Sequence, residues 1–123
     1  MIKQLLAQRN VPYFEFLQPN QYHSTDRVFS KEEATIAINP ASNFRVPAGK
    51  IFPLLVAEVG RMQQNGVAIQ SAVNVFDHVA EPVYIDDCCH FNERGNRIFG
   101  EFVANVVTQS LSKDSRYNVP GNR

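Results

Sequence analysis

Apolar residues recur along the chain at two spacings, and each spacing predicts a different kind of element. Short runs of apolar and aromatic residues favour strands, whereas apolar residues three and four positions apart favour helices. The strand pattern occurs in residues 11–17 (VPYFEFL) and again in residues 67–76, and polar turn residues (QPNQ) follow the first run. We therefore expect two main strands with apolar residues on both faces.

Two long segments carry the helical spacing. Residues 47–64 place an apolar stripe on one side of a helix, formed by Ile51, Leu54, Leu55, Val59 and Met62. Proline suits the first turn of a helix better than its interior, so Pro53 predicts that the regular helix begins near Lys50 or later. The last segment has the broadest stripe and predicts a helix from about Glu93 to Leu111, with Asn92 as its N-cap.

Shorter elements are expected in the first third of the chain. The N-terminal MIKQLLAQRN is typical of the last turns of an amphipathic helix, because its apolar residues fall on one side. Residues 20–46 are rich in polar turn residues and predict a long connection. Within it, Ser30 and Glu33 have the capping-box form and predict a short helix that ends near Ile38.

The predicted elements run helix end, strand, long connection, helix, strand, loop and helix. Alternation of strands and helices favours the α/β class, with a parallel sheet and helices on its faces. Two strands make only part of such a sheet, because an edge that is apolar on both faces normally pairs with a further strand. We expect a partial three-layer α/β/α arrangement of flavodoxin-like type, namely the C-terminal half of a doubly wound parallel sheet.

Composition and charge are those of an ordinary globular domain. Of the 123 residues, 44% are hydrophobic and 20% are charged, and twelve basic residues balance twelve acidic ones. A net charge of zero argues against nucleic-acid binding through a large basic field. No apolar run reaches the ~18–20 residues that span a bilayer, and the N-terminus lacks the apolar core of a signal peptide. Because the chain begins inside a predicted helix, we expect that it starts within a fold, and its compartment stays open.

We expect neither a cofactor nor a metal site at the two cysteines or at two of the three histidines. Cys88 and Cys89 are adjacent, and a disulfide between neighbours strains the intervening peptide bond, so we expect both to be packing residues. The alternative is a metal site built from both thiols with His90 and His78. Adjacent ligands do not readily wrap a tetrahedral ion, which disfavours that alternative. We expect His23 and His78 to be exposed loop histidines.

The stretch richest in chemistry is residues 84–96, YIDDCCHFNERGN. It places Asp87 and His90 three positions apart, between a strand-like segment and a helix start. In open α/β folds, ligands bind beyond the carboxyl ends of the strands. A carboxylate at this spacing can hold the imidazole Nδ1–H and leave Nε2 free to take a proton from a nucleophile. Asp86 is the alternative partner, because the acidic residue is doubled.

The same block resembles the C-terminal signature of the SGNH hydrolases, the GDSL-type esterases and lipases. That signature is a strand, Asp-x-x-His, a Gly-Asn-like helix start and a final amphipathic helix, and it reads here VYIDDCCHFNERGNRIFGEFVANVV. The stretch FEFLQPNQY also resembles the penultimate strand and following loop of bacterial members. The resemblance covers roughly residues 1–110. It implies a serine esterase with an SGNH-type fold, in which Asp87 orients His90 and His90 is the general base that activates a serine.

The chain departs from this family in its nucleophile. It contains neither Gly-Asp-Ser nor Gly-x-Ser-x-Gly, and the family's oxyanion-hole glycine and Gly-x-Asn-Asp block are also absent from the sequence. A His–Asp pair without a nucleophile has no acyl-enzyme route. We expect the C-terminal part of a hydrolase of small-molecule esters, inactive alone, whose N-terminal half lies upstream in the gene or is supplied by another chain. The alternative is a non-catalytic remnant or interaction module with half of the fold.

The expected organisation follows from these assignments. Residues 1–111 form the C-terminal part of the hydrolase domain, and residues 20–46 within it are a lid-like or connecting insertion. Residues 112–123 are expected to form a flexible tail. Gln18 and Pro19 follow a strand end, where they would line a cleft or form a simple turn.

Overall fold

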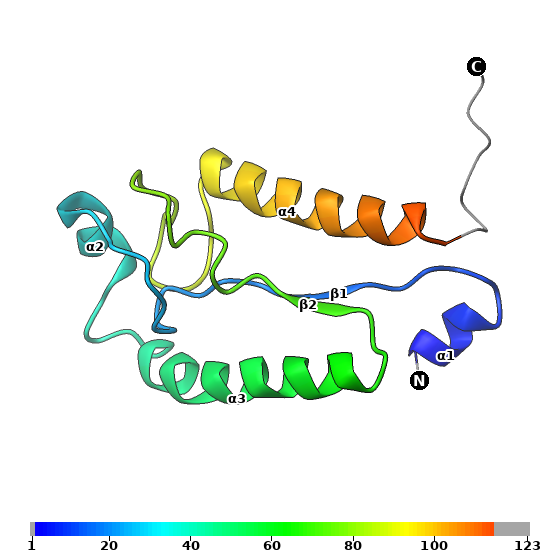
Figure 1. The fold of residues 1–123 in the computed structure, drawn as a ribbon. Helices are drawn as coiled ribbons and strands as arrows, with labels where there is room; N and C mark the ends of the chain where they lie inside the picture. The colour runs from blue at the N-terminus through cyan, green and yellow to red at the C-terminus, as the bar shows by residue number, and fades with distance from the viewer. Residues whose placement is uncertain (1, 115–123) are drawn as a thin grey trace, which may run out of the picture.

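Two short parallel strands lie between two long helices in the computed structural model, which describes residues 2–114 (Figure 1). Strand β1 (Glu15–Leu17) is connected to strand β2 (Ile69–Ser71) through residues 18–68, which include helix α3 (Arg45–Gln64). Helix α4 (Glu93–Ser112) lies on the side of the strands opposite to α3. The predicted α/β class and the parallel pairing are confirmed.

Both strands are shorter than the apolar runs that predicted them. The parallel register spans three residue pairs, from Glu15 opposite Ile69 to Leu17 opposite Ser71. After β2 the chain turns through residues 73–78, and Val73 and Phe76 become buried in these turns instead of extending the strand. Burial therefore continues beyond β2 in these turns, and the apolar alternation overestimated the length of the strand.

Helix α3 begins earlier than predicted, because Pro53 lies in its interior and not in its first turn. A proline inside a helix leaves the carbonyl four residues earlier without its usual donor. Here that carbonyl belongs to Gly49, and Gly49 and Pro53 are both exposed, so solvent can serve the carbonyl. The apolar stripe is only partly covered: Val59 is buried, whereas Leu54 is 70% exposed.

The predicted caps are present on two helices. Helix α2 (Lys31–Ala37) begins where the Ser30 hydroxyl accepts the N–H of Glu33 at 3.1 Å. Helix α4 begins where Asn92 Oδ1 accepts the N–H of Gly95 at 2.9 Å. A short N-terminal helix, α1 (Ile2–Ala7), is also confirmed. Most of the predicted tail, residues 115–123, lies outside the described residues.

The most deeply buried cluster lies beyond the carboxyl ends of the two strands. Ala37, Phe76, Val83 and Tyr84 form its centre. Phe76, Tyr84 and Phe91 pack edge to face around it, with ring centroids 5.1–5.8 Å apart. This aromatic cluster gives the loops after the strands a firm base, and these loops carry the candidate site. None of the described helices has the length and apolar character needed to cross a membrane.

Candidate functional site

A tight turn directly before helix α4, formed by residues 84–91, carries the candidate histidine, and we call it the histidine turn. Tyr84 and Phe91 pair across the base of this turn as an antiparallel bridge. The N–H of Ile85 donates to the carbonyl of His90 at 3.1 Å, and the N–H of Asn92 donates to the carbonyl of Val83 at 2.8 Å. The turn is therefore closed at its base and fixed to the helix start.

Asp86 organises this turn from within. Its Oδ1 accepts the N–H groups of Cys88, Cys89 and His90 at 3.0, 3.1 and 3.3 Å. Its Oδ2 contacts Nδ1 of the His90 ring. One carboxylate thus shapes the backbone and orients the imidazole.

The expected contact between Asp87 and His90 is corrected by this geometry. A carboxylate that accepts N–H groups two, three and four residues ahead folds the chain back over itself, which brings the ring four positions on against Asp86. Asp87 faces the long connection instead. Its Oδ2 accepts from Asn39 Nδ2 at 3.0 Å, and its carbonyl accepts from the Ser42 hydroxyl at 3.2 Å. Asp87 ties the turn to residues 39–42.

Hydrogen bonds within the turn keep Asp86 ionised, and one side of the His90 imidazole is exposed. Partial burial of Asp86 favours the neutral acid, but the hydrogen bond to His90 and the N–H donors of the turn outweigh it and lower the pKa of Asp86 to about 2. The side chain of His90 is 67% exposed. Within residues 2–114, no group hydrogen-bonds to Nε2. A group from another segment can therefore reach this nitrogen.

Replacing Asp86 by Asn is expected to reverse the tautomer of His90, and replacing Asp87 by Asn is not. In Asp86→Asn the side-chain oxygen would still accept the turn's N–H groups, so the fold is kept, while the new amide would donate to Nδ1 and place the ring proton on Nε2. Two-bond ¹H–¹⁵N NMR spectra of the ring check this. Identical ring spectra for wild type and Asp86→Asn, or the larger change in Asp87→Asn, would contradict the assignment.

The lowered pKa of Asp86 also predicts an acid-dependent stability. The folded state binds the proton less tightly than the unfolded state, so Asp86 adds stability above the ordinary pKa of Asp, about 4. That contribution is lost as the pH falls from about 4 toward about 2. Urea midpoints of wild type and Asp86→Asn are expected to differ at pH 5 and to converge near pH 2. A difference that stays constant over this range would count against the ionised Asp86.

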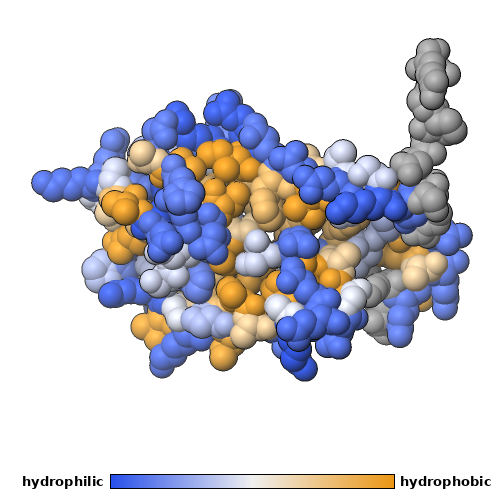
Figure 2. Space-filling view, viewed as in Figure 1, coloured by the Kyte–Doolittle hydropathy of each residue, from blue (hydrophilic) through white to orange (hydrophobic). Residues whose placement is uncertain are grey.

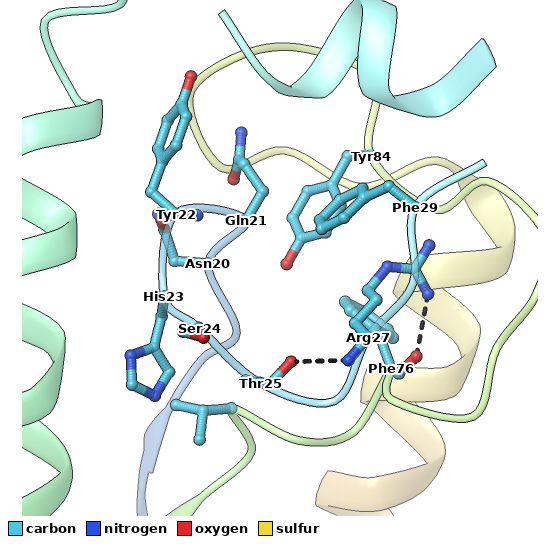
Figure 3. A pocket seen from close by; sticks show the side chains of 11 residues that line it. Asn20, Gln21, Tyr22, His23, Ser24, Thr25, Arg27, Phe29, Phe76 and Tyr84 are labelled. Carbon is cyan, nitrogen blue, oxygen red and sulfur yellow. Dashed lines mark hydrogen bonds between the residues drawn. The ribbon is translucent and has the colours of Figure 1, made fainter. Parts of the chain in front are cut away.

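A cavity of about 230 Å³ adjoins the histidine turn (Figure 3). Its lining combines polar and aromatic residues, namely Asn20, Gln21, Tyr22, His23, Ser24, Thr25, Arg27, Phe29, Val73, Phe76 and Tyr84. Figure 3 shows the Tyr84 hydroxyl pointing into this space. Two amides connect its wall with the turn: Gln21 Nε2 donates to the Asp86 carbonyl at 3.0 Å, and Asn20 Nδ2 donates to the Cys88 carbonyl at 3.3 Å.

Two buried polar atoms at this cavity lack a protein partner among the described residues, Gln21 Oε1 and Arg27 Nε. One is an acceptor and the other a donor. The charge of Arg27 is neutralised by Glu33 at 2.5 Å, so the cavity has no free cation to offer. Its size and its mixed lining suit ordered water or one small uncharged polar molecule.

The ion pair behind the cavity is the main feature that sequence patterns missed. The Glu33 side chain is fully buried, and its Oε1 accepts the N–H groups of Val83 and Tyr84 at 2.8 and 3.0 Å. Arg27 Nη1 donates to the carbonyls of Phe76 and Val79 at 2.9 and 2.7 Å. Glu33 occupies the third position after a serine cap, where a glutamate usually bonds back to the cap. No local signal distinguished this buried role from capping.

The remaining predicted positions divide between confirmation and correction. His78 is an exposed loop histidine, as expected. His23 is not, because its ring rests on Phe52 with centroids 5.7 Å apart and it lines the cavity. Gln18 is exposed and Pro19 is buried, while the cleft lining begins one residue later. Over residues 2–114, no three His, Cys, Asp or Glu side chains gather closely enough to hold a metal ion.

An apolar groove of about 300 Å³ runs between β1 and α3, away from the histidine turn. Its lining is formed by Glu15, Phe16, Leu17, Leu55, Glu58, Val59, Met62 and Ile69. Figure 2 shows apolar surface continuing through the band between the two long helices. Within the described residues, β1 pairs only with β2, so the sheet ends at both strands.

No family model matches the chain, and neither does any curated protein or solved structure. A functional assignment therefore depends on the residues of the histidine turn, on their geometry and on the incomplete sheet.

Proposed function

We propose that this chain is the C-terminal part of an SGNH-type serine ester hydrolase and that it supplies the acid–base pair His90 and Asp86. The main observation in support is that Asp86 contacts Nδ1 of the His90 ring, whose Nε2 is exposed. In this proposal Nε2 takes the proton of a serine hydroxyl and later gives it to the leaving alcohol. Asp86 holds the tautomer and stabilises the imidazolium, and Asp87 positions the turn through Asn39. The substrate would be a small-molecule ester.

The incomplete sheet supports a missing N-terminal half. Parallel sheets are normally covered on both faces and paired at their central strands. The groove beside β1 and the apolar residues of α3 offer such a covering site, since Ile51 is 49% exposed and Leu54 is 70% exposed. In the proposed three-layer fold, a further parallel strand beside β1 would end at the same edge as the histidine turn. A serine at the end of that strand would then face His90.

Alone, the chain is expected to be inactive as a hydrolase. A fluorophosphonate probe labels an activated serine, and the proposed route needs a serine that this chain does not supply. We expect no labelling and no turnover of a short nitrophenyl ester. Probe-sensitive hydrolysis that disappears in His90→Ala would show that a nucleophile lies within the chain itself, and it would overturn the proposed division into two halves.

The deciding experiment begins with the DNA upstream of Met1. An open frame with a Gly-Asp-Ser block, in frame or after one shift, predicts that the joined protein is labelled at its serine. In that protein His90→Ala should lower kcat/KM by about 10²–10⁴-fold, whereas His78→Ala, the exposed loop histidine, should leave it unchanged. Equal activity of the two variants overturns the role of His90. Unrelated upstream sequence overturns a single joined protein and favours an interaction module that binds through the β1 edge.

A further inference from the structure

The proposed hydrolase chemistry uses neither thiol of the histidine turn. Cys88 and Cys89 are free and partly buried, and their sulfur atoms lie 2.9 Å apart. That separation is well inside the ordinary non-bonded contact of two sulfur atoms. Joining them therefore needs movement within these two residues, of the side chains and of the peptide bond between them, and no rearrangement of distant backbone.

The turn holds both cysteines in this position before any reaction. Asp86 Oδ1 accepts both of their N–H groups, and Asn20 Nδ2 donates to the carbonyl of Cys88 at 3.3 Å. The peptide between the two thiols is thus bound on its acceptor side and on its donor side. Because hydrogen bonds already hold this backbone, ring closure costs less conformational entropy.

We propose that Cys88 and Cys89 are an oxidative modification site, at which a peroxide converts the adjacent thiols into a reversible vicinal disulfide. One thiolate sulfur attacks the O–O bond of hydrogen peroxide and becomes a sulfenic acid, and the leaving hydroxide is protonated to water. The second thiol then attacks the sulfenic sulfur, the S–S bond forms, and a second water leaves. The cysteines lose two electrons and two protons, and the peroxide is reduced to two waters.

Cys88 holds its proton more tightly than an isolated thiol. The hydrogen bond with Cys89 first, then burial and the neighbouring carboxylates, raise the pKa of Cys88 to about 11. Because the thiolate is the nucleophile, the reaction of Cys88 with peroxide speeds up at alkaline pH. Either sulfur can attack first, and the other then resolves the sulfenic acid.

Ring strain makes the product easy to reduce. The closed ring has eight atoms and includes the peptide bond between the two residues, whose planarity resists that closure. Strained disulfides are the labile and regulatory ones. The sequence predicted plain packing residues, so the vicinal disulfide proposed here departs from that expectation.

Oxidation should also change the environment of the His90 ring. The N–H groups of Cys88 and Cys89 share Asp86 with the imidazole, so closing the ring shifts the donors that hold this carboxylate. We expect the ¹⁵N shifts of the His90 ring to change on oxidation and to return on reduction. Such a change needs no hydrolase activity, so the redox proposal can be tested independently of the proposed function.

The test uses the full chain and hydrogen peroxide at low stoichiometry. We expect the intact mass to fall by about 2 Da with loss of both titratable thiols, and to return with dithiothreitol. The chain should remain a monomer on a non-reducing gel. Retention of both thiols, a ladder of intermolecular dimers, or only mass increases from added oxygen would each overturn the proposal.

Two single variants test the ring closure. Cys88→Ser and Cys89→Ser each keep one thiol, so each should accumulate a dimedone-reactive sulfenic acid without the loss of about 2 Da. A loss of about 2 Da in either variant would refute closure between these two residues. The mass change in wild type does not depend on either variant folding.

Discussion

Replacing Glu33 by Gln is expected to lower the free energy of unfolding by about 3–5 kcal/mol, the usual cost of breaking one side of a buried ion pair. The side chains of Arg27 and Glu33 are 4% and 0% exposed, so the arginine left behind cannot recover its hydration. Because whole domains are stable by only about 5–15 kcal/mol, much of the folded population would be lost. Urea unfolding followed by circular dichroism measures the effect.

The matched control is Glu32→Gln, one position earlier on helix α2. Glu32 is exposed, so its substitution should change stability by less than about 0.5 kcal/mol. Combining Glu33→Gln with Arg27→Met removes both charges and should recover part of the loss, because no unpaired buried charge remains. A single Glu33→Gln variant as stable as Glu32→Gln would show that this ion pair does not anchor the fold.

Gly95→Ala is expected to cost about 1–3 kcal/mol of stability through overpacking. A Cβ at Gly95 would lie 2.8 Å from Cβ of Phe91, and 3.1 Å from both Cβ and the carbonyl oxygen of Val83. These neighbours are fixed by the backbone at the base of the histidine turn, so the start of α4 must shift. We expect lower thermal stability together with altered ring signals of His90.

The same helix provides the control for that glycine. A Cβ at Gly100 meets no atom within 4 Å, and the residue lies in the middle of α4. Gly100→Ala should therefore stabilise the protein by about 0.5–1 kcal/mol, because alanine favours the helix. If the two substitutions have the same sign, close packing between α4 and the turn is not what holds Gly95 as glycine.

The predictability of this fold from sequence differs between its elements. Helix α4 was predicted within one residue, because its apolar stripe is broad and the Asn92 cap acts locally. The strands were overestimated, because apolar residues after β2 are buried in turns and no local pattern separates a buried turn from a strand. The start of α3 was wrong because an exposed interior proline costs less where solvent can bind the free carbonyl.

The site was predictable to the level of the block but not of the contact. The sequence placed His90 between a strand-like segment and the helix start, where the structure has it. The choice between Asp86 and Asp87 depends on which carboxylate collects the turn's N–H groups, and sequence spacing does not encode that choice. Gln21 and Arg27 join the cavity through contacts more than forty residues away along the chain, which no local pattern reveals.

The uncovered apolar face of α3 has a consequence for the life of the chain inside a cell. Quality-control chaperones and proteases select chains that expose apolar surface and free strand edges. A copy of this chain that has not met a covering segment would display both features permanently, and not only while it folds. Its abundance would then be set by how quickly it becomes covered. Production in the laboratory should follow the same rule, with yield falling as the concentration of uncovered chain rises.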